Sequence, residues 1–288
     1  MTGAPHRKTA RIRVERWRGG RMGARTDHVA AEEPMEIRVE VRQGATFEEI
    51  PVAVTMRTPG DDFDLAAGFL LTEGILGSPD DIDEIRYCRN VRPQEYNVVT
   101  VRAASAGGFR SDALTRNFYV SSSCGVCGKA SLEAVEAMGC APVPDLGFRI
   151  ARERVATLPE RLREAQSVFE RTGGLHAAGL FGPEGDLECV REDVGRHNAV
   201  DKVIGSRALS HGLPASGVGL VVSGRTSFEI LQKAAVAGIP MVVAVGAPSS
   251  LAVSMARQFN VSLTGFTSPD GFNVYGGDAR IIDAGEEG

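Results

Sequence analysis

The stretch "GVGLVVSGRTSFEILQKAAVAGIPMVVAVGA" occupies residues 217–247 and contains two short apolar runs separated by a segment with helical spacing of its apolar residues. Continuous apolar runs that alternate with helices are typical of strands buried on both faces of a parallel sheet. The pattern continues with a predicted helix at 251–259 and a predicted strand at 261–266. The C-terminal half is therefore predicted to be an α/β domain.

The preceding half has a different pattern. Residues 34–58 alternate between apolar and polar side chains around a glycine, which predicts two antiparallel strands. A helix is expected over 63–76 with Asp62 as its N-cap, followed by strands at 82–88 and 96–104. The predicted organisation is a basic N-terminal arm with an edge strand (1–30), a small α+β domain (31–120), a mobile cysteine-containing loop and helix (121–145) and the α/β domain (146–288).

The chain has 288 residues, 43% of them apolar, and a formal net charge of −5. Residues 1–30 carry eight Lys or Arg against two acids, which leaves 24 basic and 35 acidic residues for the remainder. An acidic body argues against nucleic-acid binding, because duplex affinity depends on neutralised phosphates. No apolar run is long enough to span a bilayer, and no secretory signal is recognisable. With five scattered cysteines, the sequence predicts a cytoplasmic protein without membrane or nucleic-acid partners.

Cys124 and Cys127 lie two residues apart between glycines, ahead of a helical run. A structural zinc site needs four ligands, and a zinc deaminase needs H-x-E and P-C-x-x-C, so the sequence predicts no metal site. Thiols ahead of a helix N-terminus and near Lys129 are expected to have lowered pKa values and to be nucleophilic. Three functions remain open for the pair: sulfur carriage, a thiol-disulfide couple, or passive ligands in a chaperone.

The predicted strands of the α/β domain end in small, hydroxyl-rich loops at 223–227, 246–250 and 265–271. In open α/β sheets ligands lie beyond the carboxyl ends of the strands, where helix N-termini attract anions. The candidate binding residues here are Ser223, Arg225 and Thr226. The alternative is that these are ordinary strand-to-helix turns with Ser and Thr as caps.

Residues 191–205, "REDVGRHNAVDKVIG", form the densest polar cluster in the chain. If a helix starts near Gly195 with Asp193 as its cap, His197 and Asp201 share one face, and Asn198 and Lys202 share another. Asp193 or Asp201 is suited to pair with a guanine edge, and Arg196 and Lys202 are suited to contact phosphate. The competing interpretation is a capped amphipathic helix with internal salt pairs. The candidate ligand-binding residues are Asp193, His197 and Asn198.

Five motifs occur together and in order: "TPGDDFDLAAGFLLTEGIL", "SSSCGVCGKASLE", "REDVGRHNAVDKVIG", "VVSGRTSFEILQKAAVAGIPMVVAVGAPSS" and "LTGF". In these motifs the chain resembles the FdhD family, the sulfurtransferase accessory proteins of formate dehydrogenase, from about residue 31 to 277. The resemblance implies that a cysteine desulfurase supplies persulfide sulfur, which passes to the bis(molybdopterin guanine dinucleotide) form of the molybdenum cofactor, bound as a substrate.

The resemblance further implies that Cys124 carries the persulfide, with Cys127 as the second thiol of the pair. It places cofactor binding on "FTSPDG", which comprises Phe266, Thr267, Ser268, Pro269, Asp270 and Gly271. It also implies a C-terminal three-layer α/β/α domain similar to cytidine deaminases, a homodimer, and formate dehydrogenase as the client. The rival functions are a thiol-disulfide oxidoreductase, which needs no nucleotide, and a non-catalytic molybdenum-cofactor chaperone.

Overall fold

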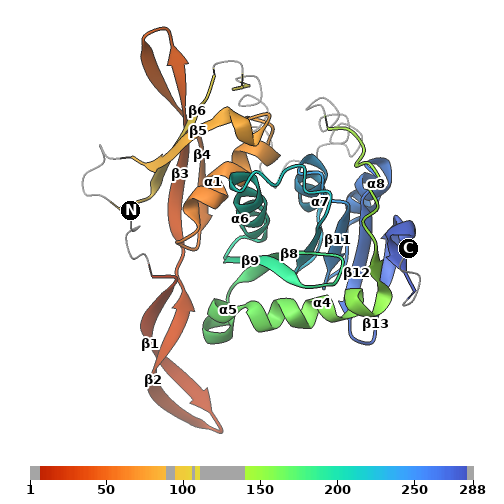
Figure 1. Cartoon of the computed structure of the whole chain (residues 1–288). Coiled ribbons are helices and arrows are strands. Elements are labelled where there is room, and N and C mark those ends of the chain that lie inside the picture. The colour runs from red at the N-terminus through yellow and green to blue at the C-terminus, as the bar shows by residue number, and fades with distance from the viewer. Residues whose placement is uncertain (1–6, 89–94, 106–107, 111–139, 284–288) are drawn as a thin grey trace.

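The structure is a computed structural model that describes residues 7–88, 95–105, 108–110 and 140–283. It consists of an N-terminal hairpin, a four-stranded sheet with one helix, and a larger α/β part (Figure 1). None of the helices in these ranges is long and apolar enough to cross a bilayer.

The first element is a hairpin of β1 (Thr9–Arg18) and β2 (Arg21–Ala30) that forms a two-stranded sheet of its own. Its two-residue turn is Gly19–Gly20, where both residues have positive φ, as the tight turns that match the twist of a hairpin require. The predicted edge strand of the basic arm is thus one half of an isolated hairpin. The hairpin projects away from the body in Figure 1.

The second part is a four-stranded sheet with strand order β4-β3-β6-β5. The predicted alternating strands are confirmed as β3 (Glu33–Gln43) and β4 (Thr46–Arg57), and the next two as β5 (Ile82–Tyr87) and β6 (Val98–Ala103). A 3-10 turn, η1 (Pro79–Asp81), precedes β5. The apolar face of this sheet packs on α1 (Asp62–Thr72), with Met35, Ile37 and Val99 fully buried between them.

Asp62 is not the N-cap of α1, contrary to the prediction. The cap position belongs to Asp61, which has a left-handed backbone and makes no side-chain cap hydrogen bond. The Asp62 carboxylate instead accepts hydrogen bonds from buried Arg57, at 3.1 Å to both oxygens, and from the Tyr87 hydroxyl. A buried guanidinium is strongly destabilising without a carboxylate partner. The Asp62 carboxylate therefore pairs with Arg57 and does not cap the helix.

The C-terminal part is built on a six-stranded sheet with strand order β13-β12-β11-β10-β8-β9. Its strands are β8 (His176–Phe181), β9 (Leu187–Asp193), β10 (Gly219–Val222), β11 (Met241–Ala244), β12 (Ser262–Ser268) and β13 (Gly271–Gly276). Strands β10, β11 and β12 are parallel, as their apolar runs predict. The sheet as a whole is mixed, because β8, β9 and β13 run antiparallel to their neighbours.

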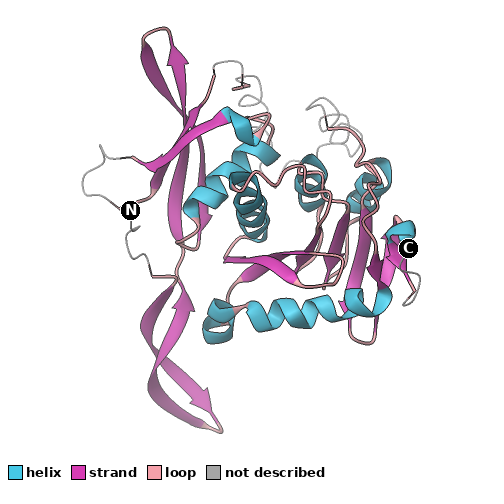
Figure 2. Ribbon diagram, viewed as in Figure 1, coloured by secondary structure: helices cyan, strands magenta, loops and turns pink. Residues whose placement is uncertain are grey.

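Helices cover both faces of this sheet (Figure 2). On one face lie α4 (Arg152–Ala165) and the short α5 (Ser167–Thr172), and on the other α6 (Arg196–Leu209), α7 (Phe228–Val236) and α8 (Ser250–Gln258). Two short strands, β7 (Ile150–Ala151) and β14 (Ile281–Ile282), pair beside α4, with η2 (Asp278–Arg280) before β14. The predicted three-layer α/β/α arrangement beside a smaller α+β part is therefore confirmed.

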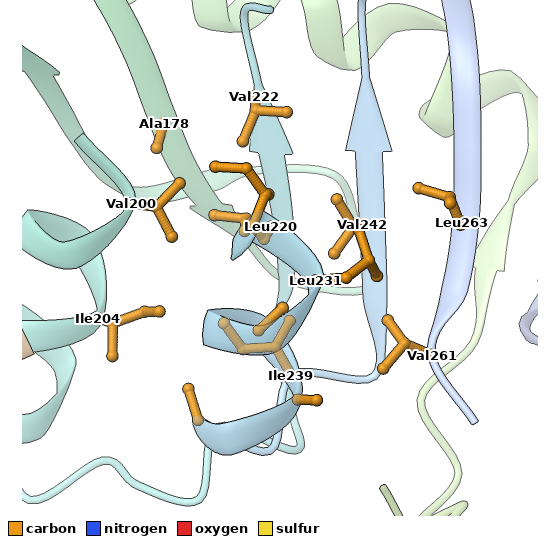
Figure 3. Close-up of a cluster of buried hydrophobic side chains, with 14 of the residues drawn as sticks. Ala178, Val200, Ile204, Leu220, Val222, Leu231, Ile239, Val242, Val261 and Leu263 are labelled. Carbon is orange, nitrogen blue, oxygen red and sulfur yellow. The ribbon is translucent and has the colours of Figure 1, made fainter. Parts of the chain in front are cut away.

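Apolar side chains fill both interfaces between sheet and helices. Figure 3 shows Leu220, Val242 and Leu263 of the strands facing Val200 and Leu231 of the helices, all of them fully buried. A second cluster under α4 contains Leu158, Phe181 and Val243. Burial of apolar surface contributes about 25 cal/mol per Å² to the free energy of folding. The two clusters therefore stabilise the packing of the helices on both faces of the sheet.

Helices α1 and α6 join the two parts of the molecule at very short range. A Cβ atom added at Gly68 would lie 1.9 Å from the backbone oxygen of Asp201, and one added at Gly205 would lie 1.8 Å from that of Asp64. Backbone therefore meets backbone at this crossing, which explains the glycines in both helices.

Candidate functional site

The carboxyl ends of β10, β11 and β12 meet at one edge of the sheet because the three strands are parallel. The loops that leave the first two strands are joined: the amide of Thr226 donates to Ala247 O at 3.2 Å, and that of Ser249 donates to Thr226 O at 3.0 Å. The amide of Phe266 in turn donates to Gly246 O at 3.3 Å. The three predicted ligand loops thus form one continuous surface.

The β8–β9 hairpin brings further polar residues to this edge. Because β8 is antiparallel to β10, its first residue, His176, lies beside the end of β10. His176 pairs with Asp193 at the end of β9, and α6 begins directly afterwards with Arg196. The N-termini of α6, α7 and α8 therefore all lie at the carboxyl edge. The partial positive charges of these termini favour an anionic ligand there.

A cavity of ≈ 900 Å³ opens at this edge between the strand ends and helices α4 and α5. Four of the predicted binding residues line it: Ser223, Thr267, Ser268 and Pro269. Phe266 precedes them, 55% exposed and with a left-handed backbone. Asp270 and Gly271 complete the turn from β12 into β13. The volume lies within the range of small-molecule sites, about 300–1,000 Å³.

Two predicted residues, Arg225 and Thr226, lie on the same loop but do not line the cavity. Arg225 is exposed, so its guanidinium is accessible to a ligand that extends beyond the cavity. Thr226 is 1% exposed, and its hydroxyl has no hydrogen-bond partner within the described ranges. Thr226 therefore packs between the two loops and does not expose its hydroxyl to a ligand.

Both histidines of the edge are held neutral. Burial, together with the nearby charge of Arg196, lowers the pKa of His176 below its ordinary value. The same two causes, with Lys233 as a further one, lower the pKa of His197 to about 4. The imidazole Nε2 of His197 lies 3.3 Å from the Ser227 hydroxyl. At neutral pH the two imidazoles are therefore neutral hydrogen-bonding groups and add no positive charge to the edge.

Asp193 and Asn198, two of the predicted ligand-binding residues, are bonded to other groups of the protein. Asp193 is fully buried, forms an ion pair with Lys202 at 2.7 Å and accepts from the Thr58 amide at 3.1 Å. Asn198 donates to Met56 O at 2.8 Å and to Asp193 at 3.0 Å. Asp193 does not cap α6 either, because Gly195 occupies that position without a side-chain cap.

Asp201 and Lys202 are likewise unavailable to a ligand. Asp201 lies 3.0 Å from the ammonium group of Lys233 and accepts from the Thr72 hydroxyl at 2.8 Å. Burial raises the pKa of Asp201 to about 6 despite this cation. Lys202 is fully buried and donates to Thr58 O at 2.9 Å. These polar groups face α1, so the interpretation of an amphipathic helix with internal salt pairs is correct for this side of α6.

One wall of the cavity has no counterpart in the sequence predictions. It comes from α4 and α5 and includes Arg163, Gln166 and Phe169, with the Arg163 guanidinium 4.4 Å from the centre of the Phe169 ring. The sequence signal is weak because α4 has low hydropathy and contains Pro159. Helical spacing of the buried Val155, Leu158 and Leu162 is the one pattern that indicates this helix.

Cys124 and Cys127 lie outside the described residues, as does Lys129. The three described cysteines, Cys88, Cys140 and Cys189, form no disulfide with one another. Cys88 is buried, and burial raises the pKa of the Cys140 thiol to about 11, which keeps it protonated. Within the part of the chain that the structure describes, no group of three or more His, Cys, Asp or Glu is arranged to hold a metal.

Fold and site together define a mixed α/β protein with a cavity at the carboxyl edge of its sheet and two closely spaced cysteines in its sequence. The sequence model of the FdhD/NarQ family matches residues 30–282. The chain therefore belongs to the FdhD/NarQ family.

Individual relatives agree with this assignment. "Sulfur carrier protein FdhD" of Streptomyces avermitilis is 50% identical over 279 residues, which are 96% of each chain. The protein of the same name from Saccharolobus solfataricus is 42% identical over 256 residues, covering 89% of this chain and 91% of the relative. A solved structure, of a putative formate dehydrogenase accessory protein from Desulfotalea psychrophila, has the same fold. It superposes with a TM-score of 0.72 at 24% identity and covers 96% of this chain and 100% of its own.

Proposed function

We propose that this protein is a sulfurtransferase that takes sulfur from a cysteine desulfurase and delivers it to the molybdenum cofactor bis(molybdopterin guanine dinucleotide). The delivery activates formate dehydrogenase. Support comes from the names of the relatives, which are sulfur carrier proteins, and from the accessory-protein title of the structural neighbour. A homodimer in the cytoplasm is part of the same proposal.

The observation that carries the cofactor half of the proposal is the cavity at the sheet edge. It is lined by Ser223, Thr267 and Ser268 and lies at the same edge of the sheet as the N-termini of α6, α7 and α8, which are on the other face. Hydroxyl groups and helix N-termini are suited to phosphate, and a dinucleotide-bearing cofactor carries several phosphates. Arg225 on the neighbouring exposed loop supplies a further cation for them.

Cys124 is the proposed carrier. Its thiolate attacks the outer sulfur of the donor's persulfide, a bond forms between that sulfur and Cys124 Sγ, and the donor leaves as a thiolate. Cys88 and Cys140 are poorer candidates, because Cys88 is buried and the Cys140 thiol has a pKa of about 11.

Cys127 provides a chemical route for releasing the carried sulfur. Its thiolate attacks Cys124 Sγ, a Cys124–Cys127 disulfide forms, and the carried sulfur leaves as hydrosulfide for the metal. The two electrons that reduce the sulfur come from the cysteine pair, which an external thiol then restores. This chemistry explains why two thiols are placed two residues apart in the sequence.

The test separates carriage from binding. Cys124→Ser is expected to abolish activation of formate dehydrogenase while cofactor binding, measured by co-purified molybdenum and guanine nucleotide, stays at the wild-type level. Cys189→Ser is the matched control, because Cys189 forms no disulfide with another described cysteine and is half-buried outside the paired motif. Full activation by Cys124→Ser would overturn the carrier role. Loss of cofactor from both variants would mean that thiol substitution damages the fold.

A further inference from the structure

The side chain of Gln166 is a buried polar group beside the cavity whose hydrogen bonding is incomplete. Gln166 joins α4 to α5, lines the cavity and is 3% exposed. Its backbone is bonded: the amide donates to Arg163 O at 3.3 Å, and the carbonyl accepts from the Glu170 amide at 3.0 Å. The side-chain nitrogen Nε2 has no hydrogen-bond partner in the described part of the chain. A buried donor without an acceptor is unfavourable, so Gln166 is expected to donate to a ligand in the cavity.

The surface around Gln166 is unsuited to phosphate. This α4–α5 wall comprises the lining residues Glu160, Leu162, Arg163, Glu164, Gln166 and Phe169. It carries two exposed carboxylates against the one guanidinium of Arg163. The first amides of α5 are already occupied, because those of Val168 and Phe169 donate to the buried Glu192 carboxylate at 2.9 and 2.7 Å. A phosphate group would therefore meet carboxylates here and no free helix terminus.

The same wall offers surface to a flat ring. The half-buried Phe169 ring lines the cavity, and the Arg163 guanidinium lies 4.4 Å from its centre. Aromatic rings and guanidinium planes are the groups on which nucleobases stack. Stacking accepts any base, because every base has a π face. A wall that selects one base also needs a hydrogen-bonding group, and Gln166 supplies one.

The strand-end wall of the cavity has different chemistry. Its lining residues are Ser223, Val245, Thr267, Ser268 and Pro269, and none of these five is acidic. The Ser223 hydroxyl accepts from the Ala177 amide at 2.9 Å and keeps its own proton to donate. The exposed Arg225 follows on the same loop. The phosphates of a nucleotide are therefore favoured on the strand-end wall, and its base on the α4–α5 wall.

We infer that the α4–α5 wall binds the base of a nucleotide arm and that Gln166 determines its specificity, by donating from Nε2 to the 6-oxo group of a purine. The inference rests on the proposed function, in which the ligand carries guanine nucleotides. Guanine presents an acceptor at this position, whereas adenine presents its 6-amino donor and leaves the buried Nε2 unpaired. Glu160 and Glu164 on the same wall are suited to accept from the N1–H and 2-amino groups of guanine.

The test is calorimetric titration of the full chain with guanosine, inosine and adenosine diphosphates as probes. Inosine diphosphate keeps the 6-oxo group but lacks the 2-amino group, and adenosine diphosphate lacks the 6-oxo group. The wild type is expected to bind the two 6-oxopurine nucleotides about fivefold more tightly than adenosine diphosphate. Gln166→Leu removes the donor and is expected to weaken both of them about fivefold without changing the affinity for adenosine diphosphate, since one net hydrogen bond contributes this much.

Two controls separate specificity from folding. Without nucleotide, Gln166→Leu is expected to unfold at the wild-type temperature or above, because it removes an unpaired buried donor. Gln232→Leu, on α7 and outside the cavity lining, is expected to bind all three probes as the wild type does.

Three results would overturn the inference while leaving the proposed function in place. They are equal wild-type affinities for guanosine and adenosine diphosphates, an unchanged guanosine diphosphate affinity in Gln166→Leu, and an equal loss of all three probes in that variant. Failure of the wild type to bind any probe would overturn the inference together with the cofactor half of the proposed function. Sulfur loading of Cys124, measured separately, reports on the carrier half alone.

Discussion

Helix α6 has two sides that meet different surroundings, and they use the same kinds of residue for different purposes. Toward α1, Asp201 and Lys202 of the helix are buried; Asp201 pairs with Lys233, and Lys202 pairs with Asp193, the last residue of β9. Toward the sheet edge, Arg196 and His197 stay partly exposed at the start of the helix. Charge in a sequence motif therefore does not by itself identify ligand-binding residues, because burial decides which charged groups remain available to a ligand.

The largest expected effect is on the buried side. Asp193→Ala leaves the fully buried Lys202 ammonium without its carboxylate at 2.7 Å. Removing one partner of a buried pair destabilises a protein by about 3–5 kcal/mol. Urea unfolding should therefore show a loss of this size, whereas Asp270→Asn, on the exposed turn of the site, should unfold like the wild type. A stable Asp193→Ala that has lost ligand binding would reverse the assignment of the two sides.

The helix crossing is expected to be nearly as sensitive. Gly68→Ala places a methyl group 1.9 Å from the backbone oxygen of Asp201, so α1 and α6 must move apart. Overpacking of this kind costs about 1–3 kcal/mol. Thermal unfolding should show the lower stability, and Gly23→Ala, where nothing lies within 4 Å, provides the control. An unchanged melting temperature for Gly68→Ala would mean that this crossing is loose.

Changes at the sheet edge are expected to alter binding without altering stability. Arg225→Ala should weaken the binding of guanosine diphosphate, used as a probe, by about 1 kcal/mol or fivefold, because an exposed charge contact contributes no more than that. Calorimetric titration measures the affinity. Arg257→Ala, in the last turn of α8 away from the strand ends, should bind as the wild type does. Equal affinities for all three proteins would remove Arg225 from the site.

The smallest effect concerns pH. The pKa of His197 is lowered from 6.5 to about 4, so between these values the unfolded chain binds a proton that the folded chain does not. Stability contributed by His197 is therefore full above pH 6.5 and is lost as the pH falls toward 4. His197→Gln should flatten this part of the curve of unfolding free energy against pH. An NMR titration that finds the His197 pKa near 6.5 would contradict the partial desolvation of this imidazole.

The sequence predicts a strand or helix well where the apolar residues of that element form a clear local pattern. The alternation in β3 and β4 and the apolar runs of β10 and β11 are of this kind. The β8–β9 hairpin and α4 are missed because α4 contains Pro159 and few apolar residues, and β8 is a short run beside a turn. The division of the chain at residues 145 and 146 stays a prediction.

Part of the candidate site can also be predicted from the sequence, because it depends on the order and direction of the strands. Ser223, Thr267 and Ser268 follow strands, so the topology alone brings them to one edge. The bonds that Asp193 and Asn198 make within the protein could not be predicted, because Thr58 and Met56 are more than 130 positions away from them in sequence. The wall formed by Arg163 and Phe169 depends on the packing of α4 and α5 under the sheet, which no local pattern encodes.

The central claim is that Cys124 carries sulfur, and intact-protein mass spectrometry after incubation with a cysteine desulfurase and free cysteine tests it most directly. The wild type and Cys189→Ser should each gain about 32 Da that a reductant removes, the mass of one sulfur atom, and Cys124→Ser should gain nothing. Cys127→Ser cannot form the disulfide that releases the sulfur and should therefore retain the adduct; no gain of about 32 Da on either the wild type or Cys127→Ser would contradict the carrier function.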